Sequence, residues 1–376
     1  MNQKTPMRPV MPPHDSPIDG SAGQSAHRDR ELLIMMVVAL SLLILLLAFF
    51  VPVAWRRAHA DAAVWDELHP ATEQTGEEQN DPLHTSHDTS DSDQEISVGT
   101  EPQIGNYMPV TTDNTKIIDE SAMDASHAIL VDLTTGEAVA QRMADERIYP
   151  ASMTKVMTVL VAVESLTAAE LETTFTMTDE IVNAAVNAGA SRAGFEPGER
   201  VKLIDLLYGA ALPSGADATA ALAQYLAGSE EQYVELMNRK AKALGLTETH
   251  FVNASGLHDE NHYSTVREIA ALMAYAMENE TCRRLLSAPS YTTAATAQHP
   301  YGITLYSTTF SRMSTTTFGP VNVIAGKTGY TEEARFCLVS LATRPDGREY
   351  VLVTVGGSSK YAPVYDCDSV YGKYLF

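Results

Sequence analysis

A serine and a lysine three residues apart offer the first candidate chemistry, at Ser152-Met153-Thr154-Lys155. Apolar residues recur at helical spacing through residues 153–165, which places Ser152 at or near the first turn of a predicted helix. Residues three apart share one helix face, so the lysine amine can reach the serine hydroxyl. A neutral amine can then take the hydroxyl proton, and we expect burial, the helix N-terminus and a second lysine to keep Lys155 neutral. Alone, the tetrad also fits an ordinary exposed lysine.

A second candidate is Lys327-Thr328-Gly329, within VNVIAGKTGYTEEARFCLV. It ends one strand pattern and precedes another, so its side chains can line a cleft while the glycine lets a substrate backbone approach closely. A cation there can bind the free carboxylate of a peptide terminus. Taken alone, the tripeptide also fits a turn.

A third candidate is Ser214, in the turn Leu212–Asp217 that opens a predicted helix. One interpretation is that Ser214 is the helix N-cap. The other is that its hydroxyl relays a proton between the nucleophile, a lysine and a leaving amine. Both interpretations remain open at this point.

The flanking elements predict an α+β fold. The segment HAILVDLTTGEAVA alternates apolar and polar residues around Thr134-Thr135-Gly136 and predicts a β-hairpin at a sheet edge. Strands are expected again after residue 288, and the last segment, APVYDCDSVYGKYLF, is typical of a closing helix. Strands at both ends of residues 106–376 predict an antiparallel sheet flanked by helices, joined to an all-helical lobe. The helices are expected at 201–211, 215–227, 230–244 and 264–278, and the late strands at 321–326, 335–343 and 349–357.

Taken together, the three motifs resemble the low-molecular-weight penicillin-binding proteins of the D-alanyl-D-alanine carboxypeptidase family, which belong to the β-lactamase/DD-peptidase-like fold. That family orders its motifs as S-x-x-K, S-x-N and K-T-G. Here the second serine follows the first by 62 residues and the K-T-G lysine follows by 175. The flanks YPASMTKVMT, LLPSGADA, FVNASGLHDENHYST and AGKTGYTEEARFCLV are also similar to family segments, and the resemblance covers about residues 110–357.

The resemblance implies a role for each motif residue. Ser152 attacks the penultimate D-alanine carbonyl of a peptidoglycan stem peptide ending in D-Ala-D-Ala, Lys155 accepts its proton, and Ser214 helps return a proton to the departing D-alanine. Among the substrate-binding residues Lys327, Thr328, Gly329 and Tyr330, the first two hold the terminal carboxylate. The backbone N–H groups of Ser152 and Tyr330 hold the oxyanion. No metal or organic cofactor is implied, and β-lactams are expected to acylate Ser152.

One position departs from the family pattern. The asparagine of the second motif is replaced by Ala216, which removes an amide expected to bind the substrate backbone and to steady the lysine. A water or a neighbour such as Asp217 or Asn253 could compensate.

The N-terminal third predicts attachment to a membrane. Residues 32–51, LLIMMVVALSLLILLLAFFV, form an uncharged run long enough to span a bilayer as a helix, within an anchor at 32–55. Ala58-His59-Ala60 resembles a signal-peptide cleavage site, but the long N-terminal region and the long apolar run favour an uncleaved anchor. Residues 61–105 hold twelve acidic residues and no Lys or Arg, so we expect residues 56–105 to be a disordered linker.

These segments lead to an expected topology. Residues 1–31 are expected in the cytoplasm, and the catalytic domain at 106–376 outside the cell, on a single-pass membrane protein. Many family members carry a β-rich second domain and an amphipathic membrane-binding helix after the catalytic domain. This chain ends at Phe376, so the anchor at 32–55 is expected to take over that task.

Composition narrows the remaining functional classes. A net charge of −22 lacks the basic footprint of a nucleic-acid binder. The three cysteines, Cys282, Cys337 and Cys367, fit buried thiols better than a disulfide framework.

Several alternatives to a carboxypeptidase share part of this pattern. A peptidoglycan DD-endopeptidase shares the same chemistry, and the loss of the motif amide motivates a catalytically silent penicillin-binding or wall-binding protein. A β-lactamase is disfavoured because no E-x-x-L-N segment lies between Ser214 and Lys327. A metal hydrolase built on His258 and His262 is disfavoured because that segment is rich in turn formers and lacks an obvious third ligand.

Overall fold

The computed structural model describes residues 107–376. The expected cytoplasmic segment, the anchor at 32–55 and the whole acidic linker at 56–105 lie outside these residues. Among the helices of residues 107–376, none has the length and apolar character needed to cross a bilayer.

A seven-stranded sheet is the centre of the described chain, in the order β1-β3-β2-β11-β10-β9-β8. All neighbouring pairs are antiparallel except β1 and β3. Its strands are β1 (Lys116–Ile117), β2 (His127–Asp132), β3 (Glu137–Arg142), β8 (Thr317–Phe318), β9 (Val321–Thr331), β10 (Arg335–Thr343) and β11 (Glu349–Gly357). Strands from both ends of the chain therefore meet in the middle of the sheet, where β2 pairs with β11.

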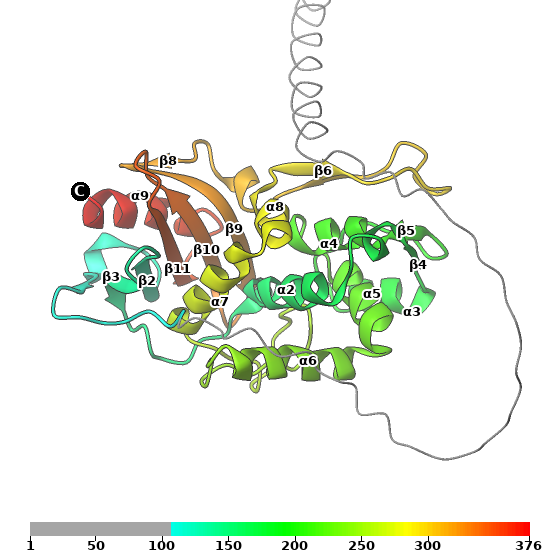
Figure 1. Cartoon of the computed structure of the whole chain (residues 1–376), viewed down its shortest axis with the longest axis horizontal. Coiled ribbons are helices and arrows are strands. Elements are labelled where there is room, and N and C mark those ends of the chain that lie inside the picture. The colour runs from blue at the N-terminus through cyan, green and yellow to red at the C-terminus, as the bar shows by residue number, and fades with distance from the viewer. Residues whose placement is uncertain (1–106) are drawn as a thin grey trace, which may run out of the picture. The chain divides into compact units, whose positions relative to one another are not determined.

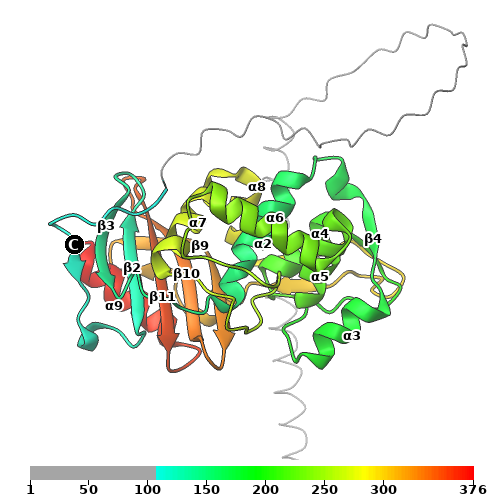
Figure 2. The same ribbon diagram turned by 90° about the horizontal axis from the view of Figure 1, so that it is seen from below.

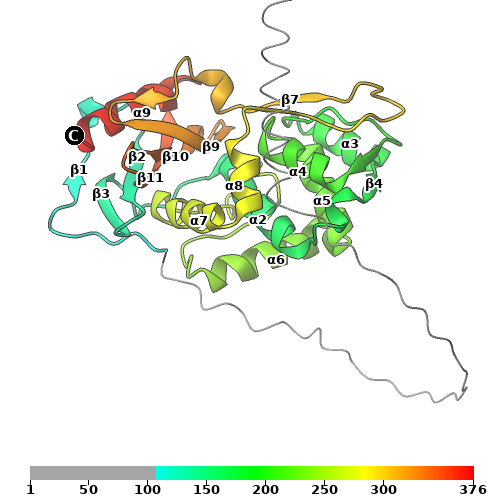
Figure 3. The same cartoon turned by 45° about the horizontal axis from the view of Figure 1, so that its top comes forward.

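The helical lobe lies beside the sheet (Figures 1 and 2). It also contains two small antiparallel sheets, β4 (Thr174–Thr176) with β5 (Arg200–Lys202) and β6 (Ser290–Thr292) with β7 (Thr304–Tyr306). Figure 3 shows the hairpin that carries β7 running along this lobe. The helices are α2 (Lys155–Ser165), α3 (Asp179–Asn187), α4 (Leu203–Ala211), α5 (Ala216–Ala227), α6 (Glu230–Ala243), α7 (Val266–Glu278), α8 (Glu280–Ser287) and α9 (Ala362–Tyr374).

Both faces of the sheet are buried, because alternate residues of β2 enter different cores. Ile129 and Val131 join the larger core, with residues of α2 and α7. Ala128 and Leu130 join a smaller core, with residues of α9. Side chains of a strand point to its two faces in turn, so apolar residues on both faces make β2 almost continuously apolar, and the alternation of apolar and polar residues predicted for it is wrong.

The expected α+β fold is confirmed, with corrections at several elements. The hairpin, the strands at 335–343 and 349–357 and the closing helix are present. β2 is an interior strand and not an edge, because β11 pairs with its other side. The lobe is not all-helical, because it contains the strands β4 and β5. Each has only three residues, which are too few to show an alternating pattern. Residues 201 and 202 belong to β5, so the helix expected at 201–211 begins at Leu203.

The strand expected at 321–326 is five residues longer than predicted. β9 runs to Thr331 and contains the whole Lys327-Thr328-Gly329 motif, which the sequence had suggested lay after the strand. Lysine, threonine and two glycines interrupt the apolar pattern without interrupting the pairing with β10.

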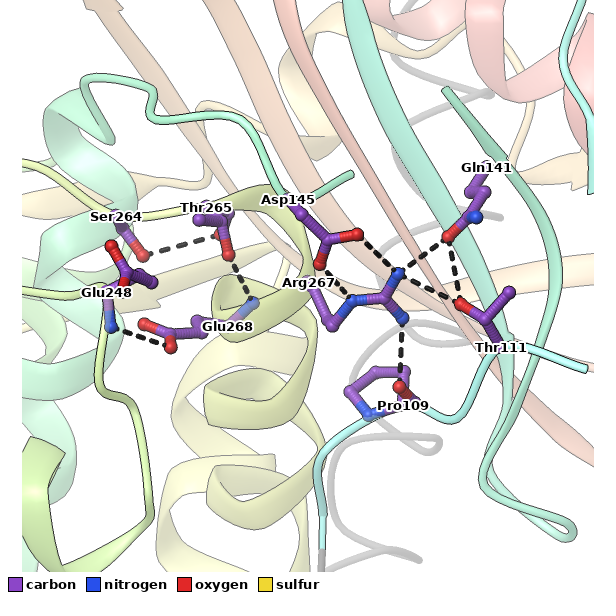
Figure 4. Close-up of polar contacts among 9 residues, drawn as sticks. All are labelled: Pro109, Thr111, Gln141, Asp145, Glu248, Ser264, Thr265, Arg267 and Glu268. Carbon is purple, nitrogen blue, oxygen red and sulfur yellow. Dashed lines mark hydrogen bonds and ion pairs between the residues drawn. The ribbon is translucent and has the colours of Figure 1, made fainter. Parts of the chain in front are cut away.

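Arg267, in the first turn of α7, fixes the connection that leads to the nucleophile (Figure 4). Its guanidinium donates to both carboxylate oxygens of Asp145, at 2.5 and 3.0 Å. It also donates to Gln141 Oε1 at 2.7 Å and to the Pro109 carbonyl oxygen at 2.9 Å. One side chain thus joins α7 to β3, to the segment at residue 109 and to Asp145, which lies seven residues before Ser152.

Candidate active site

The three motifs converge on one cleft. It is lined by Ser152, Lys155, Ser214, Thr328, Gly329 and Tyr330, together with residues 189–191 and 255–257. Ser152 and Lys155 come from the turn before α2 and its first residue, Ser214 from the turn before α5, and the other three from β9. Lys327 is the exception, because it lies behind the cleft wall and is fully buried.

The nucleophile turn is held in an unusual backbone conformation. Ser152 lies in a short 3-10 helix, Ala151–Thr154, and Ala151 has a φ of 47°, which is rare for a residue with a Cβ. A Cβ at Gly329 would lie 3.2 Å from the Ser152 backbone nitrogen, and one at Gly256 would lie 2.0 Å from the Ala151 oxygen. The glycine of K-T-G therefore admits the chain's own nucleophile turn, where the sequence had suggested a substrate backbone.

Lys155 contacts the nucleophile directly. Its Nζ lies 3.1 Å from Ser152 Oγ and donates to the Ser255 carbonyl oxygen at 2.5 Å. Burial lowers the pKa of Lys155 to about 7, although the carboxylates of Asp217 and Glu230 act in the opposite direction. An amine with this pKa is neutral in a large fraction of molecules at neutral pH, as a general base must be.

Ser214 and Lys327 form a second serine–lysine pair. Lys327 Nζ donates to Ser214 Oγ at 3.0 Å and to the Thr328 carbonyl oxygen at 3.0 Å. The N-cap interpretation of Ser214 is wrong, because Gly215 is the N-cap of α5 and Ser214 has a φ of 68° that turns its hydroxyl to the lysine. Burial, followed by the charges of Lys155 and Arg312, holds the pKa of Lys327 well below its usual value.

Arg312 is a cleft residue that the sequence analysis missed. It follows β7 in the short 3-10 helix Phe310–Arg312 and lines the same cleft as Ser152. Next to it, Thr308 Oγ1 and Thr328 Oγ1 lie 2.7 Å apart, and both residues also line the cleft. A lone arginine fifteen residues before K-T-G belongs to no local motif, so no sequence signal distinguished it.

Ala216, at the missing amide, lines the cleft as the first residue of α5. The neighbouring Asp217 is fully buried. Its carboxylate accepts the N–H groups of Ala193 at 2.8 Å and Gly194 at 3.1 Å. Asp217 therefore ties down the 193–194 segment and does not take the place of the amide in the cleft.

The two histidines considered for a metal site have other partners. His262 is buried, its Nδ1 accepts the Val252 N–H at 3.2 Å, and its Nε2 lies 2.7 Å from Thr154 Oγ1. Burial lowers the pKa of His262 to about 4, so the ring is neutral and donates from Nε2 to the threonine. His258 packs edge-on against Tyr149. Both rings thus support the turns around the nucleophile.

Comparison with known proteins agrees with this geometry. Residues 114–359 match the peptidase S11 family model, described as D-alanyl-D-alanine carboxypeptidase. The chain is 35% identical to D-alanyl-D-alanine carboxypeptidase DacF of Bacillus subtilis over 243 residues, 63% of this chain and 59% of that protein. It is 33% identical over 233 residues to a D-alanyl-D-alanine carboxypeptidase of Streptomyces sp. K15, covering 60% of this chain and 78% of that one.

Solved structures give the same result. The crystal structure of the Streptomyces K15 DD-transpeptidase superposes with a TM-score of 0.60 at 29% identity, over 68% of this chain and 99% of that one. A D-alanyl-D-alanine carboxypeptidase from Mycobacterium tuberculosis H37Rv gives 0.58 at 28% identity, over 70% and 94%. The chain spans about 59% of the length of DacF, so the likeness concerns the part described above. This chain belongs to the peptidase S11 family of D-alanyl-D-alanine carboxypeptidases.

Proposed function

We propose that this protein is a serine-type D-Ala-D-Ala carboxypeptidase that removes the terminal D-alanine of peptidoglycan stem pentapeptides. The observation that carries the proposal is the pair of contacts at one cleft, with Lys155 Nζ 3.1 Å from Ser152 Oγ and Lys327 Nζ 3.0 Å from Ser214 Oγ. A nucleophile, its base and a second hydroxyl suited to proton transfer are the groups that acyl transfer needs.

In the proposed acylation step, Ser152 Oγ attacks the carbonyl carbon of the penultimate D-alanine and gives its proton to Lys155. The oxyanion is held by the backbone N–H groups of Ser152 and Tyr330. The C–N bond then breaks, and the proton returns through Ser214 to the nitrogen of the departing D-alanine. Water attacks the ester, which restores Ser152 and releases the shortened peptide.

The terminal carboxylate needs a cation that the substrate can reach. Lys327 is fully buried, and its amine donates hydrogen bonds to Ser214 Oγ and to the Thr328 carbonyl oxygen. Arg312 and Thr328 line the cleft itself, whereas Lys360, which also lines it, is solvent-exposed and lies over the Tyr361 ring. We therefore assign the charge-assisted contact to Arg312, with the Thr328 hydroxyl beside it, and give Lys327 the task of orienting Ser214.

The experiment is incubation of the full-length protein with a stem pentapeptide ending in D-Ala-D-Ala, followed by mass spectrometry. Loss of one D-alanine is expected, with none for Ser152→Ala. Fluorescent penicillin is expected to label the parent protein and not the variant. A parent protein that releases no D-alanine would contradict the proposal, and penicillin labelling without release would favour a silent penicillin-binding protein, the alternative suggested by Ala216. Cleavage of a cross-linked dimer but not of the pentapeptide would favour an endopeptidase.

We further propose that residues 32–55 anchor the chain as a single pass and that residues 106–376 act outside the cell. The support is the uncharged run at 32–51, the acidic stretch after it, and the extracytoplasmic position of peptidoglycan. Protease added to intact cells is expected to release the catalytic part. The protein is expected to stay in the membrane fraction after an alkaline wash.

A further inference from the structure

The loop at residues 253–257 supplies what Ala216 lacks toward the lysine. At the position of the missing amide the cleft wall has only a methyl group. On another side of the cleft, the Ser255 carbonyl oxygen lies 2.5 Å from Lys155 Nζ and 3.5 Å from Ser152 Oγ. A hydrogen-bond acceptor for the amine is therefore present, but the main chain provides it.

Asn253 holds this carbonyl in place. Its Oδ1 accepts the N–H of Ser255 at 3.2 Å, the hydroxyl of Ser255 at 3.1 Å and the N–H of Gly256 at 2.7 Å. Its Nδ2 donates to the Leu257 carbonyl oxygen at 2.9 Å. One amide thus makes four hydrogen bonds within a five-residue loop, and they fix the orientation of the peptide group that follows Ser255.

The same loop is braced against the nucleophile helix and turn. The Ala254 carbonyl oxygen accepts from Thr158 Oγ1 of α2 at 2.7 Å, and the Ala254 N–H donates to Glu230 Oε1 at 2.9 Å. Gly256, with a φ of 78°, lies so close to Ala151 that any Cβ would overlap its carbonyl oxygen. The loop and the nucleophile turn are consequently one packed unit, and a change in one displaces the other.

We infer that Asn253 is a positioning residue for the general base: it fixes the Ser255 carbonyl, which takes one N–H of Lys155 and so directs the amine toward Ser152. A neutral amine has two N–H bonds and one lone pair, and catalysis requires the lone pair to face the Ser152 hydroxyl. The Ser255 carbonyl oxygen, which lies beside the serine hydroxyl, takes one N–H of the amine and so limits the directions in which the lone pair can point. This inference rests on the proposed function, and it assigns to the loop only the lysine-steadying half of the task expected of the missing amide.

The test compares three variants of the full-length protein with the parent. Asn253→Ala removes the amide that holds the loop. Asn279→Ala is the matched control, because Asn279 caps α8 by accepting the N–H groups of Thr281 and Cys282 and is not among the residues that line the cleft. The double variant Asn253→Ala/Ala216→Asn restores an amide in the cleft. Each is assayed for kcat and KM on a D-Ala-D-Ala pentapeptide, for the pH dependence of acylation by penicillin, and for thermal stability.

Asn253→Ala is expected to lower kcat by up to about a hundredfold with little change in KM, since misplacing a reacting group acts on the chemical step. In the pH profile of its acylation by penicillin, the acidic limb is expected to move to higher pH, because water entering beside Lys155 weakens the desolvation that keeps the amine neutral. Asn279→Ala is expected to lose thermal stability while keeping the parent's kcat and the parent's pH profile of acylation. The added asparagine in the double variant is expected to recover about tenfold of the lost kcat.

Two results would overturn the inference alone. One is a parent that is acylated and turns over while Asn253→Ala keeps its kcat and pH limb. The other is a loss of kcat in Asn253→Ala that is matched by an equal loss of kcat in Asn279→Ala at the same loss of thermal stability, with no recovery of kcat in the double variant. A parent that neither reacts with penicillin nor releases D-alanine would overturn the proposed function and the inference together.

Discussion

Two serine–lysine pairs with nearly equal Nζ–Oγ distances lie at the same cleft, and their surroundings differ. Lys155 reaches Ser152 within one turn of chain, at 3.1 Å, whereas Lys327 reaches Ser214 across 113 residues, at 3.0 Å. Burial lowers the pKa of both amines. The charges around them act in opposite directions, because Asp217 and Glu230 favour the protonated form of Lys155, while Lys155 and Arg312 disfavour the protonated form of Lys327.

The difference indicates a division of labour between chemically identical groups. The carboxylates keep the pKa of Lys155 near 7, so this amine can both accept and return a proton near neutral pH. Burial and the neighbouring cations lower the pKa of Lys327, whose amine donates a hydrogen bond to Ser214. In the proposed function, the cation for the substrate is the separate side chain Arg312.

Removing the first amine is the strongest way to test this division. Lys155→Met is expected to slow acylation of Ser152 by penicillin by about 10² to 10⁴-fold, the usual contribution of a general base. The matched change Lys240→Met removes a lysine that lies outside the cleft and pairs with Glu164, and it is expected to leave acylation unchanged. Stopped-flow labelling measures both. An acylation rate in Lys155→Met equal to that of the parent would exclude Lys155 as the base.

The same variant has a predicted effect on stability. Because the folded pKa of Lys155 is about 7 and the unfolded value is 10.5, the unfolded chain binds more protons between these values. The parent's free energy of unfolding should therefore rise with pH across this window from this group. Lys155→Met removes the cost of the buried charge, so its advantage in urea unfolding should be largest at or below about pH 7 and vanish near about pH 10. A constant difference at all pH values would argue against a depressed pKa.

Ser214→Ala tests the second pair and is expected to lower kcat by about a hundredfold, because the leaving amine loses its route to a proton. KM should change much less. Ser340→Ala serves as the control and should keep full kcat. Ser340 is a buried serine on β10, and its hydroxyl lies 3.0 Å from Tyr371 Oη. Steady-state kinetics decide between them, and equal kcat in the parent and Ser214→Ala would remove Ser214 from the proton path.

Arg312→Met separates the two cation assignments. A hydrogen bond to a charged group contributes about 1.5–3 kcal/mol, so kcat/KM should fall by about tenfold to a hundredfold on the pentapeptide acid. The parent should prefer this substrate over the same peptide with an amidated C-terminus, and the variant should lose most of that preference. Arg284→Met, on an exposed position of α8, should keep it. A full preference in Arg312→Met would move the carboxylate contact to another cation, either Lys327 or the cleft residue Lys360.

Glu230→Gln should have the smallest effect. Gln retains an oxygen to accept the Ala254 N–H but removes a carboxylate that favours protonated Lys155. The acidic limb of the acylation rate should therefore move to lower pH, by less than about one unit. A shift to higher pH would show that loosening of the 253–257 loop dominates over the lost charge.

The sequence was sufficient for the order and type of most elements. The strands at 335–343 and 349–357 lie where predicted, since nine-residue runs of β-branched and apolar residues flank the turn at Pro345-Asp346-Gly347. The S-x-x-K contact was also predictable, because helix geometry alone brings residues three apart together. The extent of β9 was not, because pairing with β10 carries it through Lys327 and Gly329 against the apolar pattern.

By itself, then, the sequence determined which segments carry chemistry and which family they resemble. Only the tertiary structure decided that Lys327 is buried behind the cleft, that Arg312 enters it, and that a main-chain carbonyl at Ser255 meets Lys155. The reason is physical. A motif consists of side chains that are close together in the chain. Burial, by contrast, depends on contacts between segments a hundred residues apart, and so does the position of a backbone oxygen. Burial lowers the pKa of both amines.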